Sequence, residues 1–369
     1  MPTSDQALPV DRLHRIGVVV KDVERAATRY AEIFGIDHWD VRAIDTAAGD
    51  QVEIDGRSVP AALRTVTGTL PSGVVAFELV DAGRGETTYQ YLRCIRGQGV
   101  HHLTIRVGSR SQVDELTAEL AKRGAGVAQR IRSRHGHETV QFDTQRLLGG
   151  YHLQAVVEPP DAAGSTAAVD EVWDLSTSYE RPGGRDPLDV QQLHHLGIVV
   201  RDVVPTVERY ADTFGITTWP FMNWRTEYGR LDAPFYRGEP VDHGYFCGMG
   251  FGYRNFGFEL IQPTHGRSHY KEDFLDLVGE GVHHMQLVYP EDEDEWAGIV
   301  DWMGGLDIPV VMGSQLRGGA TTFYYLNTQE ALGGWSIETT IRHAGADPSK
   351  RIYDFTREFP DAPRDPFAS

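Results

Sequence analysis

An α+β fold built from two related halves is predicted for this chain of 369 residues, because the sequence repeats itself along almost its whole length. Residues 13–20 (LHRIGVVV) match residues 193–200 (LHHLGIVV) at an offset of 180. Three later matches are FEL at 77–79 and 258–260, GVHH at 99–102 and 281–284, and LGG at 148–150 and 332–334. The offset rises only to 184, so the two halves are expected to share one architecture.

Each half is predicted to divide again into two modules of one strand, one helix and three further strands. Residues 16–20 form a β-branched apolar run typical of a buried strand, and apolar residues at helical spacing then run from Val23 until Gly35 ends the helix. Other expected elements of the first half are strands at 74–80, 100–107, 139–143 and 151–157 and a helix at 113–123. The chain is therefore expected to contain four βαβββ modules.

The repeat also predicts the domain organisation. Residues 1–160 form the first expected domain and residues 191–345 the second. Between them, residues 161–190 contain DAAGSTAA and RPGGRDP, which are typical of an exposed linker. Residues 346–369 are expected to be a C-terminal tail.

Composition narrows the class of protein. With 40% hydrophobic and 24% charged residues, no apolar run of 18 residues and no signal-like N-terminus, the chain is expected to be cytoplasmic. A net charge of −18 disfavours nucleic acids and anionic membranes as partners. The two cysteines, Cys94 and Cys247, are too few for a thiolate metal site or a disulfide framework, so any metal must use histidines and carboxylates.

Four strand positions that recur in both halves carry residues suited to metal binding. In the second half they hold two imidazoles and two carboxylates: His195, Glu259, His284 and Glu338. This set can bind a divalent ion. In the first half the same positions hold Arg15, Glu78, His102 and Gln154. An arginine beside Glu78 is expected to form an ion pair where a metal would otherwise lie, so the first half is interpreted as a degenerate copy, with packing or an altered ligand site as its remaining role.

The motifs resemble the vicinal oxygen chelate superfamily, which includes glyoxalase I, methylmalonyl-CoA epimerase, extradiol ring-cleaving dioxygenases and antibiotic-resistance proteins. The resemblance covers residues 12–158 and 192–343. It rests on four segments of the second half: HLGIVVRDV at 195–203, FELIQP at 258–263, GVHHMQLV at 281–288 and GGWSIE at 333–338.

The resemblance implies that each pair of modules closes into an open β-barrel, giving two barrels. It also implies that the second histidine of each His-His pair is the ligand, hence His195 and His284, and that one divalent ion per chain (Zn, Mn, Co, Ni or Fe(II)) binds a substrate through two neighbouring oxygens. His194 and His283 are then packing residues or partners that orient the ligands.

Three functions remain open from the sequence. A lyase or isomerase of glyoxalase or epimerase type would stabilise an enolate, with Glu338 or Glu259 as the base, and the presence of Glu259 favours it. An Fe(II) ring-cleaving dioxygenase would use His195, His284 and Glu338, and a two-domain chain with an inactive first half is typical of that class. A non-catalytic protein that binds a small molecule is the third candidate.

Weaker signals concern the substrate and the assembly. The aromatic-rich segment from Trp219 to Phe258 predicts either a loop pinned by aromatic packing or the wall of a pocket for an apolar or aromatic small molecule. His243, His269 and Tyr325 are the candidate substrate-binding or acid–base residues of this half. No phosphate-binding loop or organic cofactor is indicated, and both a monomer and a homodimer are compatible with the sequence.

Overall fold

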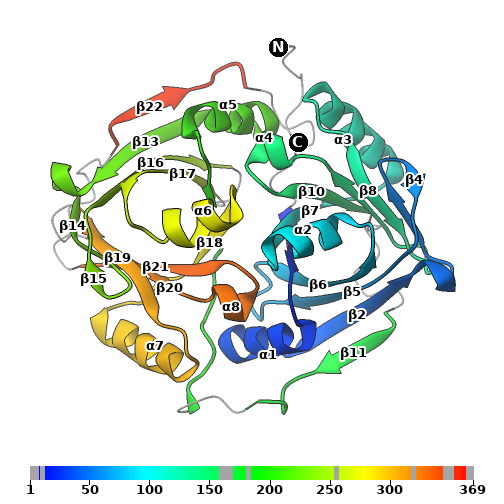
Figure 1. Ribbon diagram of the computed structural model, residues 1–369, viewed down its shortest axis with the longest axis horizontal. Coiled ribbons are helices and arrows are strands. Elements are labelled where there is room, and N and C mark those ends of the chain that lie inside the picture. The colour runs from blue at the N-terminus through cyan, green and yellow to red at the C-terminus, as the bar shows by residue number, and fades with distance from the viewer. Residues whose placement is uncertain are drawn as a thin grey trace. The chain divides into compact units, whose positions relative to one another are not determined.

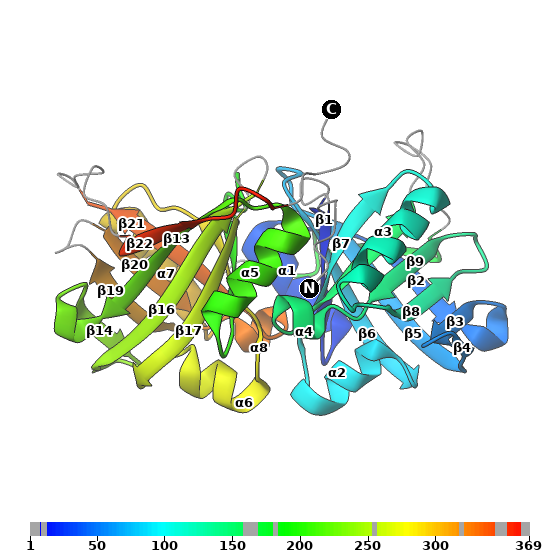
Figure 2. The ribbon, with the colours of Figure 1, turned by 90° about the horizontal axis from the view of Figure 1, so that it is seen from above.

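The computed structural model describes residue 8 and residues 13–157, 169–179, 184–252, 257–316, 321–343 and 353–362. These residues fall into two compact units, the first formed mainly by residues before 180 and the second mainly by residues 180–362. Each unit is built on one sheet of eleven strands that curls round on itself, as Figure 1 and Figure 2 show. The predicted α+β fold with two half-barrel sheets is confirmed.

The first half of the chain contains the elements that the repeat predicts, with short additions. They are β1 (Leu13–Val19), α1 (Val23–Phe34), β2 (His38–Asp45), η2 (Thr46–Ala48), β3 (Gln51–Ile54), β4 (Arg57–Ser58), β5 (Ala61–Thr69), β6 (Ala76–Gly85), α2 (Thr88–Arg96), β7 (Gly99–Val107), α3 (Arg110–Lys122), β8 (Val127–Arg132), β9 (Glu138–Phe142), α4 (Gln145–Leu148), β10 (His152–Val157) and β11 (Glu171–Asp174).

The second half repeats this order. Its elements are β12 (His195–Val199), α5 (Val203–Phe214), β13 (Thr218–Arg225), η5 (Thr226–Tyr228), β14 (Leu231–Tyr236), β15 (Glu239–Pro240), β16 (His243–Phe251), β17 (Gly257–Gly266), the π-helix η7 (Lys271–Leu275), α6 (Asp276–Val278), β18 (Gly281–Val288), α7 (Glu293–Gly305), β19 (Val310–Leu316), β20 (Thr321–Leu326), α8 (Gln329–Leu332), β21 (Ser336–Arg342) and β22 (Phe355–Glu358).

The strand order shows how two modules make one sheet. In the second unit, β13, β16, β17 and β12 of one module lie beside β18, β21, β20 and β19 of the next. The two modules meet where β12 pairs antiparallel with β18. The first unit has the same arrangement, with β1 pairing antiparallel with β7. Four strands from two modules therefore form the centre of each sheet.

Capping residues in the sequence explain where helix α1 begins and ends. The Asp22 side chain accepts a hydrogen bond from the backbone N–H of Arg25 and caps the N-terminus of α1. At the other end Gly35 adopts φ 69°, the left-handed conformation that glycine tolerates best, and its N–H donates to the carbonyl of Ala31. Helix α1 therefore begins and ends where its capping residues stand.

Two segments outside the repeat add strands to the sheets. In the predicted linker, β11 pairs antiparallel with β2, while residues 161–168 lie outside the described residues. In the predicted tail, β22 pairs antiparallel with β13. Both segments thus extend the edge of a sheet, which neither the Gly/Pro content nor the charge of these regions signals.

The inner faces of the two sheets differ in character. Aliphatic side chains such as Val80 and Leu63 dominate the core inside the first sheet. Large aromatic side chains such as Trp224, Tyr245 and Tyr325 dominate the core inside the second. Figure 1 shows α2 at the mouth of the first curled sheet and α6 at the mouth of the second.

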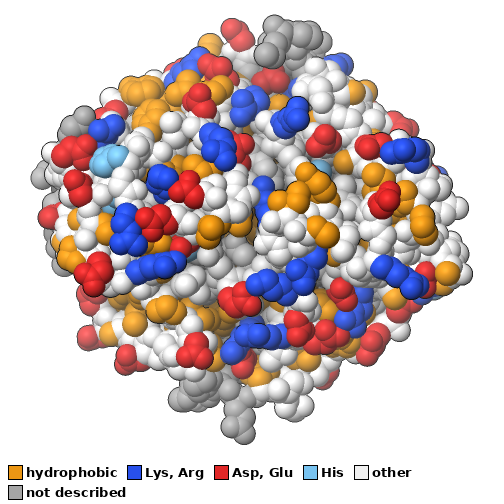
Figure 3. Space-filling view, viewed as in Figure 1, with side chains coloured by type: hydrophobic (Ala, Val, Ile, Leu, Met, Phe, Trp, Pro, Cys, Tyr) orange, Lys and Arg blue, Asp and Glu red, His pale blue; other side chains and the backbone are white. Residues whose placement is uncertain are grey.

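The surface and the helices bear on possible partners. In the part of the chain that the structure describes, every helix is too short or too polar to cross a membrane. On the face seen in Figure 3, acidic and basic side chains are interspersed. On that face, no large basic patch offsets the net charge of −18.

Candidate metal centre

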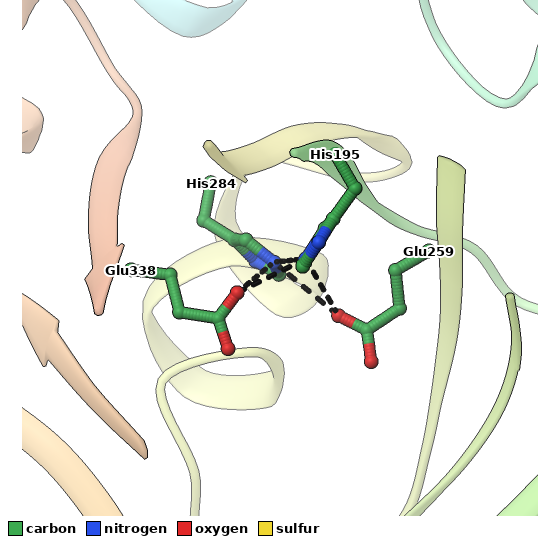
Figure 4. A group of neighbouring side chains, drawn as sticks. All are labelled: His195, Glu259, His284 and Glu338. Carbon is green, nitrogen blue, oxygen red and sulfur yellow. Dashed lines mark hydrogen bonds and ion pairs between the residues drawn. The ribbon is translucent and has the colours of Figure 1, made fainter. Parts of the chain in front are cut away.

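The four residues predicted as metal ligands come together inside the second curled sheet. His195, Glu259, His284 and Glu338 lie on β12, β17, β18 and β21, which are adjacent in the order β21-β18-β12-β17. All four side chains are buried and point toward one centre, as Figure 4 shows. Each central strand thus contributes one side chain to the same point of the inner face.

The distances between the four side chains are those of ligands around a shared ion. His195 Nε2 lies 3.3 Å from His284 Nε2, 3.4 Å from Glu259 Oε2 and 3.0 Å from Glu338 Oε2. His284 Nε2 lies 3.3 Å and 3.2 Å from the same two oxygens. For metal–ligand bonds of about 2.1 Å, neighbouring ligands lie about 3.0 Å apart in an octahedron and about 3.4 Å apart in a tetrahedron.

The hydrogen bonding at this centre also fits a cation. Among the described residues, Glu338 Oε2 has no hydrogen bond of good geometry although it is buried. Two Nε2 atoms at 3.3 Å cannot both direct a proton at the other. A donor set of two imidazoles and two carboxylates suits a divalent ion.

Electrostatics couples the imidazoles to the carboxylates. Burial alone would lower the pKa of His195, but Glu259 and Glu338 outweigh it and raise this pKa to about 9. Burial alone would raise the pKa of Glu338, but the two imidazoles hold it well below its usual range. Two buried negative charges therefore need two compensating positive charges, which either two protons or one divalent ion supplies.

The close approach of the His284 ring explains why the motif at 195–200 contains Gly197. It lies opposite His284 in the β12–β18 pair. A Cβ at Gly197 would lie 1.8 Å from Cε1 of His284, so only glycine lets the imidazole lie flat over the strand. Gly17 has the same relation to His102 in the first unit, where the corresponding distance is 2.0 Å. The glycine thus sets the position of the His284 ring.

The equivalent centre of the first unit is occupied by an ion pair, as predicted. Arg15 Nη1 donates to Glu78 Oε2 at 3.1 Å, and both side chains are buried. His102 Nε2 lies 3.5 Å from the same oxygen. Burial would raise the pKa of Glu78, but Arg15 and His102 together hold it far below its usual range.

A network of neutral side chains completes this first centre. Gln154 Oε1 accepts a hydrogen bond from Gln141 Nε2 at 2.8 Å, and Gln154 Nε2 donates to Thr104 Oγ1 at 3.2 Å. Gln141 Nε2 also donates to the hydroxyl of Tyr89 at 2.6 Å. Among the described residues, the first unit contains no group of three or more His, Cys, Asp or Glu side chains arranged for a metal.

The three weaker candidates lie in different places. Tyr325 is buried beside the centre, with its ring centroid 5.0 Å from that of His284. His269 is also buried, and its Nε2 lies 3.1 Å from the hydroxyl of Ser336 at the start of β21. His243 is buried at the start of β16, where among the described residues neither ring nitrogen has a hydrogen-bond partner.

Two residues near the centre escaped the sequence reasoning. The hydroxyl of Tyr270 lies 2.7 Å from that of Tyr325, and both rings are buried on the inner face. Tyr270 aligns in the repeat with Tyr89 at an offset of 181, and Tyr325 aligns with Gln141 at an offset of 184. The alignment of the two halves could therefore have indicated that these two positions belong together. The alignment gives no such indication for Ser336, because the first half has His152 at that position.

The aromatic segment predicted as a pocket wall divides between two faces of the sheet. Trp224 and Tyr245 belong to the core inside the curl. Phe221 instead stacks on Phe246 and on Phe355 of β22, and the rings of Phe246 and Phe355 are tilted against each other. Tyr253 and Phe256 lie outside the described residues. Only part of the segment therefore faces the candidate centre.

A protein-family model and solved structures match this chain. Residues 14–142 match the model of the Glyoxalase/Bleomycin resistance protein/Dioxygenase superfamily. A mutant of 4-hydroxymandelate synthase from Streptomyces coelicolor is 16% identical with a TM-score of 0.54, over 91% of this chain and 93% of that one. The Mn(II)-bound glyoxalase from Novosphingobium aromaticivorans is 14% identical with a TM-score of 0.43, over 89% and 81%. No curated protein matches the sequence.

The family match covers most of the first half of the chain, and the second half repeats the strand order of the first. The family description names a glyoxalase, a drug-resistance protein and a dioxygenase. The chain has to be assigned among these kinds of activity by the chemistry of its own site.

We predict that Gly197→Ala lowers the affinity for divalent metal by at least about tenfold, because the added methyl displaces the His284 ring. The matched control is Gly17→Ala, which crowds His102 in the first unit. Both substitutions should lower the melting temperature, but only the first should weaken Co²⁺ binding in a titration. Equal cobalt affinity in the two variants would contradict the prediction.

We predict that Glu78→Gln destabilises the protein by about 3–5 kcal/mol at neutral pH, because it leaves the Arg15 cation buried without its partner. The pKa of Glu78 is lowered in the folded state, so its contribution is complete above its ordinary value of about 4.5 and is lost as the pH falls. Urea unfolding from about pH 7 to about pH 3 should therefore show a difference that shrinks in acid.

The control for this series is Glu24→Gln, which removes an exposed ion pair with Arg64 (2.6 Å). An exposed pair contributes at most about 1 kcal/mol, so this variant should unfold like the wild type. A Glu78→Gln difference that stays constant down to about pH 3 would rule out the buried ion pair as its cause.

Proposed function

We propose that this protein is a divalent-metal-dependent lyase or isomerase of the glyoxalase or epimerase type. The observation that carries the proposal is the position of Glu259, whose Oε2 lies 3.3–3.4 Å from both ligand imidazoles. Glu259 thus joins Glu338 as a second carboxylate at the centre. A two-histidine, one-carboxylate iron site does not require this fourth group.

The residues that would hold the ion are His195, Glu259, His284 and Glu338. When bound, a divalent ion supplies Lewis acidity that stabilises negative charge on the oxygens of a chelating substrate. The chain supplies the base. A proton α to a substrate carbonyl moves to a carboxylate oxygen of Glu338 or Glu259, and the same oxygen returns it to a neighbouring carbon or oxygen.

Other side chains of the inner face would orient the substrate. The paired hydroxyls of Tyr270 and Tyr325 are polar groups within an aromatic core, beside the His284 ring. They can donate hydrogen bonds to a substrate oxygen, while Trp224 and Tyr245 present apolar surface. The expected substrate is therefore a small molecule with two neighbouring oxygens and an apolar or aromatic part.

A ring-cleaving dioxygenase that uses Fe(II) with His195, His284 and Glu338 is the second candidate. One observation favours it: His269, which precedes His284 by 15 residues, is buried and contacts Ser336, the register partner of His284. Asp273 Oδ2 lies 3.3 Å from the other ring nitrogen of His269. A histidine held in this way is a candidate acid–base group for that chemistry.

The two candidates differ in their dependence on Glu259 and on oxygen. We predict that the anaerobically purified protein retains about one divalent ion per chain, that Glu259→Gln and His284→Ala both lose it, and that catechols cause no oxygen uptake. Elemental analysis and an oxygen electrode make these measurements. Retained iron in Glu259→Gln, together with catechol-dependent oxygen uptake, would instead establish the dioxygenase.

The surface offers a control for adventitious binding. Glu227, Asp242 and His265 form a second group of potential ligands, but its carboxylates are exposed. Glu227→Gln should leave the metal content unchanged. A wild-type protein that stays metal-free after reconstitution with Zn²⁺, Mn²⁺, Co²⁺, Ni²⁺ or Fe²⁺ would favour the third reading, a binding protein without catalytic function.

A further inference from the structure

Each candidate ligand histidine is contacted by the histidine that precedes it in the sequence. Nδ1 of His194 lies 2.9 Å from Nδ1 of His195, and Nδ1 of His283 lies 3.1 Å from Nδ1 of His284. Neighbouring residues of a regular strand point to opposite faces, so this pairing requires an interruption of the strand.

A β-bulge provides that interruption at His283, and His194 lies just before the first residue of β12. In the β12–β18 pair, Gly197 is the partner of His284 and Ile198 is the partner of Val282, so His283 is the extra residue. At the other end of the pair, Gln286 is the register partner of His195 and also accepts a hydrogen bond from the backbone N–H of His194. A bulge places two consecutive residues against one partner and redirects a side chain.

The hydrogen-bonding rules assign the direction of these contacts. His195 and His284 present Nε2 to the candidate centre. With a divalent ion held on Nε2, a neutral ligand ring carries its proton on Nδ1. A contact between two Nδ1 atoms needs one donor and one acceptor. The preceding histidine must therefore accept through Nδ1 and carry its own proton on Nε2.

We propose that His283 and His194 are positioning residues that accept the Nδ1–H of His284 and His195 and so fix the tautomer and the plane of each ligand ring. This inference rests on the proposed metal site. Ligand histidines usually donate this proton to a carboxylate, a backbone carbonyl or water. Here Glu259 and Glu338 already balance a divalent ion, and a neutral imidazole orients each ligand without adding a third buried negative charge.

The two positioning residues have different surroundings. His283 is fully buried, and its ring meets those of His269 (4.7 Å between centroids) and Phe274 (5.1 Å) edge to face. Nε2 of His283 has no hydrogen-bond partner among the described residues. His194 is half-buried beside the rings of Phe251 and Tyr289. Water can replace His194 more easily than His283, so His283 is the stricter test.

The first unit supplies a matched control. His101 is the extra residue of the bulge between β1 and β7, and its Nδ1 lies 3.1 Å from Nδ1 of His102. The geometry of the histidine pair is thus present in both units. Only the second unit joins it to two carboxylates that are not already paired with an arginine.

The experiment measures Co²⁺ affinity and the visible spectrum of bound Co²⁺ in the full chain for His283→Phe, His283→Asn and His101→Phe. Phenylalanine keeps a ring in the aromatic surroundings but removes the acceptor. The side-chain amide oxygen of asparagine lies near the position of Nδ1 and restores it. We expect His283→Phe to weaken binding about 10–100-fold and to change the spectrum, His283→Asn to bind nearly as the wild type does, and His101→Phe to have no effect.

Unchanged affinity in His283→Phe, or equal losses in His283→Phe and His283→Asn, would overturn the proposal. Either result would mean that metal binding does not depend on a hydrogen-bond acceptor at the position of Nδ1 of His283. Failure of the wild type to bind Co²⁺ would overturn the proposed function itself. Should His283→Phe fail to fold, nitrogen-15 NMR of the Zn²⁺-loaded wild type decides: the proposal requires the proton of His283 on Nε2, and a proton on Nδ1 excludes it.

Discussion

The burial of two carboxylates at one point is the constraint on which the second half of this protein depends. Glu259 and Glu338 lie inside the curled sheet, where an uncompensated negative charge costs several kcal/mol. The compensation comes from His195 and His284, or from a cation that they help to hold. The close packing of the four central strands, the glycine under His284 and the bulge at His283 are the features that allow these side chains to meet.

The first half meets the same constraint in a different way. Glu78 occupies the position of Glu259, but Arg15 provides a permanent cation and Gln154 replaces the second carboxylate. The charge is balanced within the chain, and neutral glutamine, threonine and tyrosine side chains satisfy the remaining polar atoms. Two related sheets therefore show alternative solutions to one electrostatic problem: a fixed ion pair, and a centre that a divalent cation can complete.

The bulges link the fold to the candidate chemistry. A regular β12–β18 pair would turn His283 away from His284, and a side chain at position 197 would exclude the imidazole from its place. The same backbone irregularity and the same glycine occur in the first unit around Gly17 and His102. These features thus belong to the architecture of the module. The residues placed on them decide whether the module can bind metal.

The sequence by itself determined the repeat, the βαβββ modules, the four candidate ligands and the replacement of the first centre by Arg15 and Glu78, because residue type and spacing along the chain encode all of these. It did not reveal the pairing of Tyr270 with Tyr325, the contact of His269 with Ser336 or the strands at 171–174 and 355–358. These depend on which strands become neighbours in the curled sheet. Contacts between residues as much as 140 positions apart follow from strand order and register, which only the tertiary structure decides.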